Sequence, residues 1–265
     1  MIPKALLLER VAGTTPLVIS LPHVGIDLPP EVAAQMTPRG RQVEDTDWNV
    51  DRLYGFARSA GAAWLQPRLS RYAIDLNRPP GDEALYAGQL STGLCPTLTF
   101  DGAPLYAGAQ PDRAEIERRR ERYWAPYHAS LAQLLLEARA RHGFAVLLDA
   151  HSIRSHVPRL FEGRLPDINI GTNDGRSCSH ALVTGVEERL SAQGRFTHVL
   201  NGRFKGGHIT RYYGRPDDGL HSMQIELAQS AYMDELGPLF DAMRAAPLIA
   251  LLKEIVAVLL DFKPR

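Results

Sequence analysis

The feature that most restricts the fold of this sequence is the uninterrupted apolar run from Phe144 to Leu148. Such a run, without alternating polar residues, is typical of a strand buried on both faces of a sheet. Other short apolar or β-branched segments also predict strands. They cover Pro16–Pro22, Ala62–Gln66, Arg71–Leu76, Asp167–Gly171, Thr197–Leu200 and Met223–Leu227.

Segments with helical periodicity separate these strands. Helices are predicted over Asp45–Ala60 with Asp45 as N-cap, over Ser179–Gln193 and over Leu239–Leu260, and a short one within residues 25–43. The longest, Pro111–His142, should be kinked or divided at Pro126. Its basic run Arg118–Arg120 is mixed with glutamates and predicts a solvated helix face rather than an anion-binding patch.

The alternation predicts an α/β protein: one three-layer α/β/α domain over residues 1–265, with a mixed, mostly parallel sheet. No composition shift or linker divides the chain. The segment Pro80–Gln110, rich in Gly and Pro, is predicted to be a long surface loop.

Composition excludes several classes of protein. The 30 basic and 30 acidic residues give a formal charge of zero, so no overall field attracts nucleic acid or anionic lipid. The two cysteines form neither a disulfide framework nor a zinc or redox motif, which fits a reducing cytoplasm. Ala5–Leu8 is too short for a signal-peptide core, and Ala245–Phe262 is interrupted by charges, which predicts an amphipathic helix. We therefore expect a cytoplasmic protein with no nucleic-acid or membrane partner.

Polar side chains stand where predicted strands end, and this is where ligands bind in open α/β sheets. His23 follows the first strand, His151 follows the buried strand, and Glu226 lies near the end of a late strand. Two imidazoles and a carboxylate can form a zinc site with an open fourth position, although a single His after a strand is more often structural. Asp149, two residues before His151, could orient its ring.

Two further segments carry groups suited to an acidic ligand. Asn77 and Arg78 lie beyond the predicted strand Arg71–Leu76, and Arg211 follows a glycine pair. An arginine can bind a carboxylate through two parallel hydrogen bonds. Sequence motifs of serine hydrolases, P-loop proteins and dinucleotide-binding proteins are absent from the chain.

Taken together, these segments resemble the N-formylglutamate amidohydrolase (N-formylglutamate deformylase) family of histidine breakdown, over nearly the whole chain. The matching segments are Leu21–Gly25, Asp45–Tyr54, Ser70–Arg78, Leu148–Ser152, Phe204–Gly214 and Gln224–Glu226. The family is distantly similar to aspartoacylase and the zinc carboxypeptidases. The resemblance implies their phosphorylase/hydrolase-like fold.

The resemblance also implies roles for individual residues. His23 and His151 match two zinc ligands. The acidic third ligand is assigned to Asp47, with Asp27 and Asp45 as alternatives. Those relatives hold a substrate carboxylate with residues that match Asn77 and Arg78. Glu226 matches their catalytic acid, and Arg211 their second arginine, which binds substrate or stabilises the oxyanion.

The expected reaction is zinc-dependent hydrolysis of N-formyl-L-glutamate to formate and L-glutamate. In it Glu226 would accept a proton from water that zinc has acidified, and later pass it to the leaving nitrogen. Three alternatives stay open: an amidase for another N-acyl acidic amino acid, a non-haem iron enzyme using the same two-His-one-carboxylate set, and a non-catalytic binder of acidic metabolites.

Overall fold

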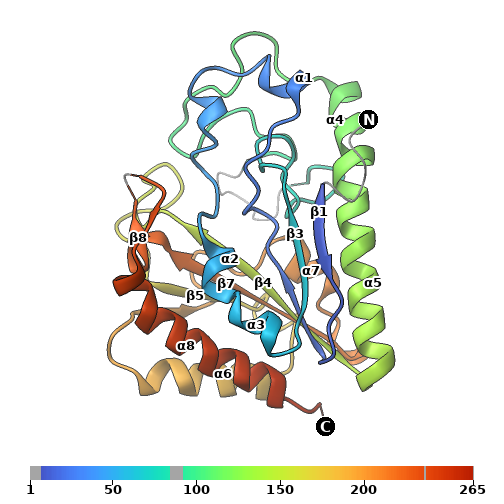
Figure 1. Cartoon of the computed structure of the whole chain (residues 1–265), viewed down its shortest axis with the longest axis vertical. Helices are drawn as coiled ribbons and strands as arrows, with labels where there is room; N and C mark the ends of the chain where they lie inside the picture. Colours follow the sequence, from blue (N-terminus) through green and yellow to red (C-terminus); the bar gives the residue numbers. More distant parts are fainter. Residues whose placement is uncertain (1–6, 84–91, 236, 265) are drawn as a thin grey trace.

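A seven-stranded sheet forms the centre of the molecule (Figure 1). It is seen in a computed structural model that describes residues 7–83, 92–235 and 237–264. The strand order is β1-β3-β2-β4-β7-β5-β6. The strands are β1 (Leu8–Val11), β2 (Leu17–Ser20), β3 (Ala63–Pro67), β4 (Ala145–Ile153), β5 (Ile168–Gly171), β6 (His198–Leu200) and β7 (Leu220–Ala228).

The sheet is mixed but mostly parallel. Strand β1 is antiparallel to β3, and β5 is antiparallel to β7, while the other four neighbouring pairs are parallel. Because β2, β4 and β7 run in the same direction, their carboxyl ends meet at one edge of the sheet. The predicted fold class is confirmed.

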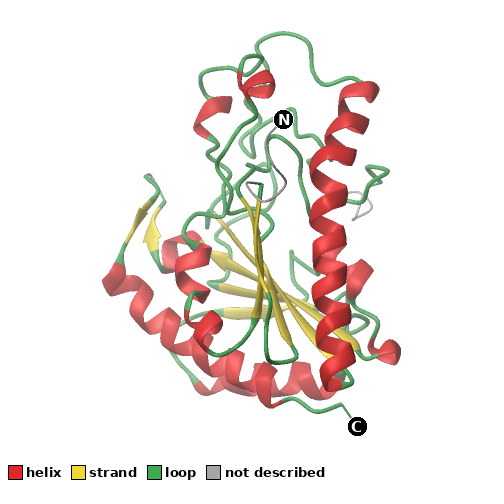
Figure 2. Cartoon of the chain, turned by 45° about the vertical axis from the view of Figure 1, so that its right-hand side comes forward, coloured by secondary structure: helices red, strands yellow, loops and turns green. Residues whose placement is uncertain are grey.

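Helices cover both faces of this sheet (Figure 2). On one face, α5 (Ala125–His142) and α7 (His208–Tyr213) pack against apolar side chains of β2, β3 and β4. On the other face lie α2 (Val50–Tyr54), α3 (Phe56–Ser59), α6 (His180–Ala192) and α8 (Ala242–Asp261). The remaining elements are α1 (Pro30–Ala33), α4 (Arg113–Arg119), the two-stranded β8 (Met233–Asp234) and β9 (Leu239–Phe240), a π-helical turn (Arg120–Trp124) and three short 3₁₀ turns.

Strand β4 is longer than predicted. The apolar run begins it, but all of its residues from Ala145 to Ile153 are buried, including Asp149 and His151. These polar residues therefore lie inside the strand rather than after it. Pairing with β7 places His151 directly opposite Glu226, which brings two of the candidate residues together.

Two predicted elements are wrong in part. Arg71–Leu76 is not a strand but a series of turns, because the charged side chains of Arg71 and Asp75 are buried and bond to each other. The helix predicted from Asp45 begins only at Val50. Asp45 does not cap it, since its buried carboxylate accepts hydrogen bonds from Tyr72 and from the backbone N–H of Phe100.

The long helical segment after Pro111 is divided, as predicted from Pro126. A π-helical turn joins α4 to α5, and Pro126 lies in the first turn of α5. The prediction of a solvated basic face fails at Arg119. Its buried guanidinium donates to the carbonyl of Ala73 and the hydroxyl of Tyr106.

Other boundaries differ less. The last helix starts at Ala242, since Leu239–Phe240 forms β9, and it presents a buried apolar face as expected. In the predicted surface loop Pro80–Gln110, residues 84–91 lie outside the described part, as do Ala5 and Leu6 of the N-terminal segment. Within the described part, no helix has the length and apolar character needed to span a bilayer.

Candidate active site

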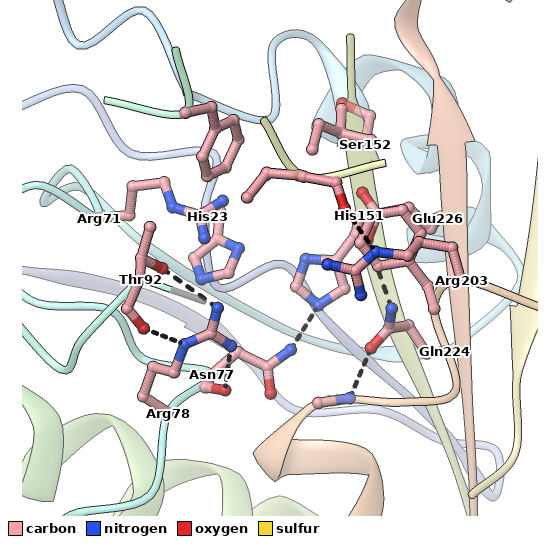
Figure 3. Close-up of a pocket in the computed structure, with 15 residues that line it drawn as sticks. His23, Arg71, Asn77, Arg78, Thr92, His151, Ser152, Arg203, Gln224 and Glu226 are labelled. Carbon is pink, nitrogen blue, oxygen red and sulfur yellow. Dashed lines mark hydrogen bonds between the residues drawn. The ribbon is translucent and has the colours of Figure 1, made fainter. Parts of the chain in front are cut away.

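An open pocket of about 640 Å³ lies at the edge where β2, β4 and β7 end (Figure 3). Ten polar residues line it: His23, Arg71, Asn77, Arg78, Thr92, His151, Ser152, Arg203, Gln224 and Glu226. Gly207 and four apolar residues, Phe100, Ile153, Leu160 and Phe204, complete the wall.

Three of the predicted residues converge at the base of this pocket. His23 lies three residues beyond β2, Asp47 lies in the loop before α2, and His151 lies on β4. The Asp47 Oδ2 atom is 2.9 Å from His151 Nδ1 and 3.6 Å from His23 Nδ1. All three side chains are buried, and one ligand atom from each lies within 4.8 Å of the others, so the group could hold a metal ion.

Each imidazole is held from behind by a buried carboxylate. The Nε2 of His23 is 2.8 Å from Asp75, and the Nε2 of His151 is 3.1 Å from Asp149. With a metal on the other ring nitrogen, each Nε2 would carry the proton and donate it to this carboxylate, which is the usual outer support of a metal-bound His. The role expected for Asp149, that of orienting His151, agrees with this contact.

The donor set fits a metal ion. Among the described residues, His23 Nδ1 is a buried polar atom without a hydrogen-bond partner, and it faces Asp47. Such an orphaned atom is costly unless a ligand satisfies it. In the described part of the chain, three buried carboxylates contact the two rings, those of Asp47, Asp75 and Asp149. Arg71 provides a single buried guanidinium among them. A divalent cation between the rings would offset this excess of negative charge.

The charges within the group are strongly coupled. Burial alone would raise the pKa of Asp47, but His23 and His151 hold it below the ordinary value. Burial would likewise lower the pKa of His151, yet Asp149 and Asp47 raise it well above the ordinary value. Without a bound cation, the carboxylates thus favour the protonated form of His151. A bound metal would take the place of that proton.

Glu226 faces the same pocket from β7. Burial raises the pKa of its carboxyl to about 8. Gln224 donates from Nε2 to its Oε2 at 3.3 Å, and the backbone N–H of Gly207 donates to Gln224 Oε1 at 2.8 Å. The second bond fixes which way the Gln224 amide points. A carboxyl with a pKa near neutrality is suited to accepting and returning a proton.

Residues 15–233 match the family described as FGase, N-formylglutamate amidohydrolase. The chain belongs to the N-formylglutamate amidohydrolase family. It is 49% identical over 250 residues to the N-formylglutamate deformylase of Pseudomonas aeruginosa, covering 94% of each chain. It is 46% identical to that of Pseudomonas putida, covering 94% of this chain and 93% of that one.

Solved structures of similar proteins share the fold. A crystal structure of N-formylglutamate amidohydrolase from Ralstonia eutropha JMP134 has a TM-score of 0.78 and 28% identity, with 96% of each chain covered. A gene product of Agrobacterium tumefaciens has a TM-score of 0.73 at 17% identity, with coverage of 97% of this chain and 94% of that one, and it supports the fold alone. The family resemblance inferred from the sequence is confirmed.

The two other candidates for the acidic metal ligand, Asp27 and Asp45, do not belong to the group formed by the two imidazoles and Asp47. Asp27 is half exposed and pairs with Arg68 at 3.0 Å. The Oδ2 of Asp45 accepts from Tyr72 and Phe100. Of the three acids considered, Asp47 alone belongs to the cluster with both rings.

Of the three predicted substrate-binding residues, Asn77 and Arg78 line the pocket and Arg211 does not. Arg78 lines the pocket, with its Nε donating to the carbonyl of Thr92 at 2.8 Å. Asn77 also lines it, but its Nδ2 lies 3.1 Å from Asp149 and 2.9 Å from His151 Nε2. Arg211 is not among the described residues lining the pocket. Its Nε donates to the carbonyl of Gly206 at 2.9 Å.

Sequence reasoning missed two pocket arginines. Arg71 was inside a segment expected to be a strand, and it bonds to Asp75 at 2.8 Å and Asp47 at 3.5 Å. Arg203 lies in the loop before α7, immediately before the segment Phe204–Gly214 that carries the resemblance. Its position directly beside that segment is the sequence feature that could have identified it as a pocket residue.

Proposed function

We propose that this chain hydrolyses N-formyl-L-glutamate to formate and L-glutamate with one bound zinc ion. The observation that carries the proposal is the convergence of His23, Asp47 and His151 with Glu226 in one pocket. Relatives named N-formylglutamate deformylase, at 49% and 46% identity over 94% of the chain, support the substrate.

His23, Asp47 and His151 would hold the metal. Two imidazole nitrogens and one carboxylate oxygen form a donor set that zinc accepts in catalytic sites, where it keeps a further position open. When bound, zinc acts as a Lewis acid that polarises a carbonyl group and acidifies water. Asp75 and Asp149 keep both rings oriented through Nε2.

Glu226 moves the proton in this proposal. Its carboxylate accepts a proton from the water that attacks the formyl carbon, and it then delivers that proton to the glutamate nitrogen as the C–N bond breaks. The hydrogen bond from Gln224 keeps the carboxylate facing the pocket. Burial raises the pKa of this carboxyl above that of an exposed glutamate, which brings it closer to neutrality and lets one group serve as base and then as acid.

We also propose that residues 1–265 form a single amidohydrolase domain that acts in the cytoplasm on a small acidic N-formyl amino acid, in histidine breakdown. The buried clusters on the two faces of one sheet support the single domain. The near-zero net charge supports a small-molecule partner rather than nucleic acid or membrane.

The test measures released formate and released free amino acid, since the N-acetyl and N-succinyl substrates yield no formate, and combines this with metal analysis. The chelated protein is reloaded with Zn²⁺ or Fe²⁺ and given N-formyl-, N-acetyl- and N-succinyl-L-glutamate and N-formyl-L-aspartate. We expect one equivalent of zinc, and formate released fastest from N-formyl-L-glutamate. Faster hydrolysis of another acyl derivative would identify an amidase of different specificity. Activity with iron alone, or no hydrolysis at all, would refute the proposal.

A further inference from the structure

The proposed substrate carries two carboxylates, and the pocket holds three arginines that differ in their surroundings. Arg71 is buried and already pairs with Asp75 and Asp47. It therefore serves the metal-binding cluster. Arg78 makes only a longer contact to these carboxylates, 4.0 Å from its Nε to Asp75 Oδ2, and Arg203 enters the pocket from the loop before α7.

These two arginines enter the pocket from opposite sides. Figure 3 shows Arg78 on one side and Arg203 on the other, with the His151 ring between them. The guanidinium group of Arg203 points into the pocket on the side of Glu226. A ligand whose amide lies at the metal cluster can thus extend one arm toward each arginine.

The surroundings of Arg203 are built to keep it in place. Its Nε donates to the backbone carbonyl of Leu160 at 2.9 Å, and its guanidinium carbon lies 5.4 Å from the centre of the Phe204 ring. Phe204 in turn packs edge-on against Phe161, with the ring centres 6.2 Å apart. The loop that carries Arg203 is therefore held by a small hydrophobic cluster with Phe100, Ile153, Val157 and Leu165 at its centre. An arginine held in advance loses less entropy when it binds a carboxylate.

The two sides of the pocket differ in polarity. Arg78 is bonded to the backbone and hydroxyl oxygens of Thr92. Arg203 lies beside Leu160 and Phe204, which pack in the same hydrophobic cluster as Phe100 and Ile153. Apolar walls suit methylene groups, and in glutamate the methylenes lie between the α-carbon and the side-chain carboxylate.

From this arrangement we propose that Arg203 binds the side-chain carboxylate of the substrate and sets the preference for an acidic side chain, while Arg78 binds the α-carboxylate. The proposal rests on the proposed function, since it specifies how that substrate lies in the pocket. It replaces the sequence-based pairing of Arg78 with Arg211.

The test compares two substrates that differ by one charge. N-formyl-L-glutamate and N-formyl-L-glutamine share the formyl group and the α-carboxylate, and only the first has a charged side chain. Formate release is measured for the zinc-loaded parent and for Arg203→Gln, Arg203→Lys and Arg78→Gln. Arg176→Gln is the matched control, because Arg176 is an exposed arginine away from the pocket.

Removing a bidentate arginine from a partly desolvated carboxylate typically costs tens-fold to thousands-fold in affinity. Arg203→Gln should lower kcat/KM for formylglutamate by about 100-fold and leave formylglutamine within about threefold of the parent. Arg203→Lys, which keeps the charge without the planar fork, should retain an intermediate preference. Arg78→Gln should lower kcat/KM for both substrates to a similar extent, and Arg176→Gln should change neither.

An unchanged preference in both Arg203 variants, or an equal loss for both substrates, would overturn the assignment of Arg203 and leave the proposed function standing. Melting temperatures identify a variant that fails to fold, and in that case Arg203→Lys decides. No formate release by the parent enzyme would refute the proposed function and this inference with it.

Discussion

The carboxylates behind the two imidazoles allow a prediction in which two similar substitutions have different consequences. Asp75 supports His23 and Asp149 supports His151. Replacing either by Asn removes a negative charge next to the Nε2 of a proposed metal ligand. Loss of such an outer partner typically weakens metal affinity by about 10–100-fold. We therefore expect Asp75→Asn and Asp149→Asn to weaken zinc binding by similar factors.

Their effects on stability should differ. The Oδ2 of Asp75 accepts from the buried Arg71 Nη2 at 2.8 Å. In Asp75→Asn an amide N–H₂ would face this donor, or else face His23. Leaving one partner of a buried ion pair uncompensated costs about 3–5 kcal/mol. Because Arg71 keeps a longer contact of 3.5 Å to Asp47, we expect the lower end of this range, about 3 kcal/mol.

Asp149→Asn has a neighbour that can adapt. The Oδ1 of Asp149 accepts from the Ser20 hydroxyl at 3.1 Å, and that hydroxyl also lies 3.0 Å from the Tyr127 hydroxyl. A hydroxyl both donates and accepts, so Ser20 can reverse its hydrogen bond and accept from the new amide. The cost in unfolding free energy should stay near 1 kcal/mol.

The assay measures zinc affinity by chelator competition, and the free energy of unfolding of the chelated proteins in urea. The reasoning is supported if both variants lose zinc affinity and Asp75→Asn alone is strongly destabilised. It is refuted if neither variant changes zinc affinity, or if Asp149→Asn destabilises the metal-free protein as much as Asp75→Asn does.

Three other results are expected. His23→Ala and His151→Ala should each lose bound zinc and activity while melting cooperatively; full zinc occupancy in both, measured by atomic absorption, would exclude the site. Asp47→Asn should weaken zinc binding in the same measurement and Asp27→Asn should not, and the reverse would reassign the third ligand. Burial lowers the pKa of His128 to about 3, so its neutral form stabilises the fold above the unfolded pKa near 6.5 and this contribution is lost as pH falls toward 3. The free energy of unfolding in urea should fall by about 2 kcal/mol between pH 6.5 and 5.0. His128→Gln should reduce this fall. An equal fall in the variant would show that His128 is not the group responsible.

Much of the fold followed from patterns local in the sequence. The run Phe144–Leu148 predicted the central strand, and the alternation around it predicted the layers. The antiparallel edge strand β1 was missed because Leu8–Val11 includes Glu9 and Arg10 and shows no apolar run. The two-residue strands β8 and β9 are too short for any periodicity to show.

Part of the site was predictable from polar residues at or near strand ends. His23 follows β2, and His151 and Glu226 lie near the carboxyl ends of β4 and β7, whereas Asp47 came from the family resemblance. Arg71–Leu76 looked like a strand because it is a short segment with the apolar run Tyr72–Ile74 at its centre. Its true path depends on buried charges that find partners only in the folded protein. Arg203 was missed because its loop is positioned by the packing of Phe204 on Phe161, which no local pattern encodes.

Glu226 gives the most direct test of the central claim, that a metal cluster and this carboxyl act together in one pocket. Glu226→Gln keeps the size of the side chain and can still accept the hydrogen bond from Gln224, but it cannot take a proton from water. A general base contributes typically 10²–10⁴-fold. The measurement is kcat for formate release together with zinc content and melting temperature. We predict one zinc per chain, an unchanged melting temperature and a fall in kcat of at least about 100-fold. Near-normal turnover, or loss of the zinc, would contradict the account.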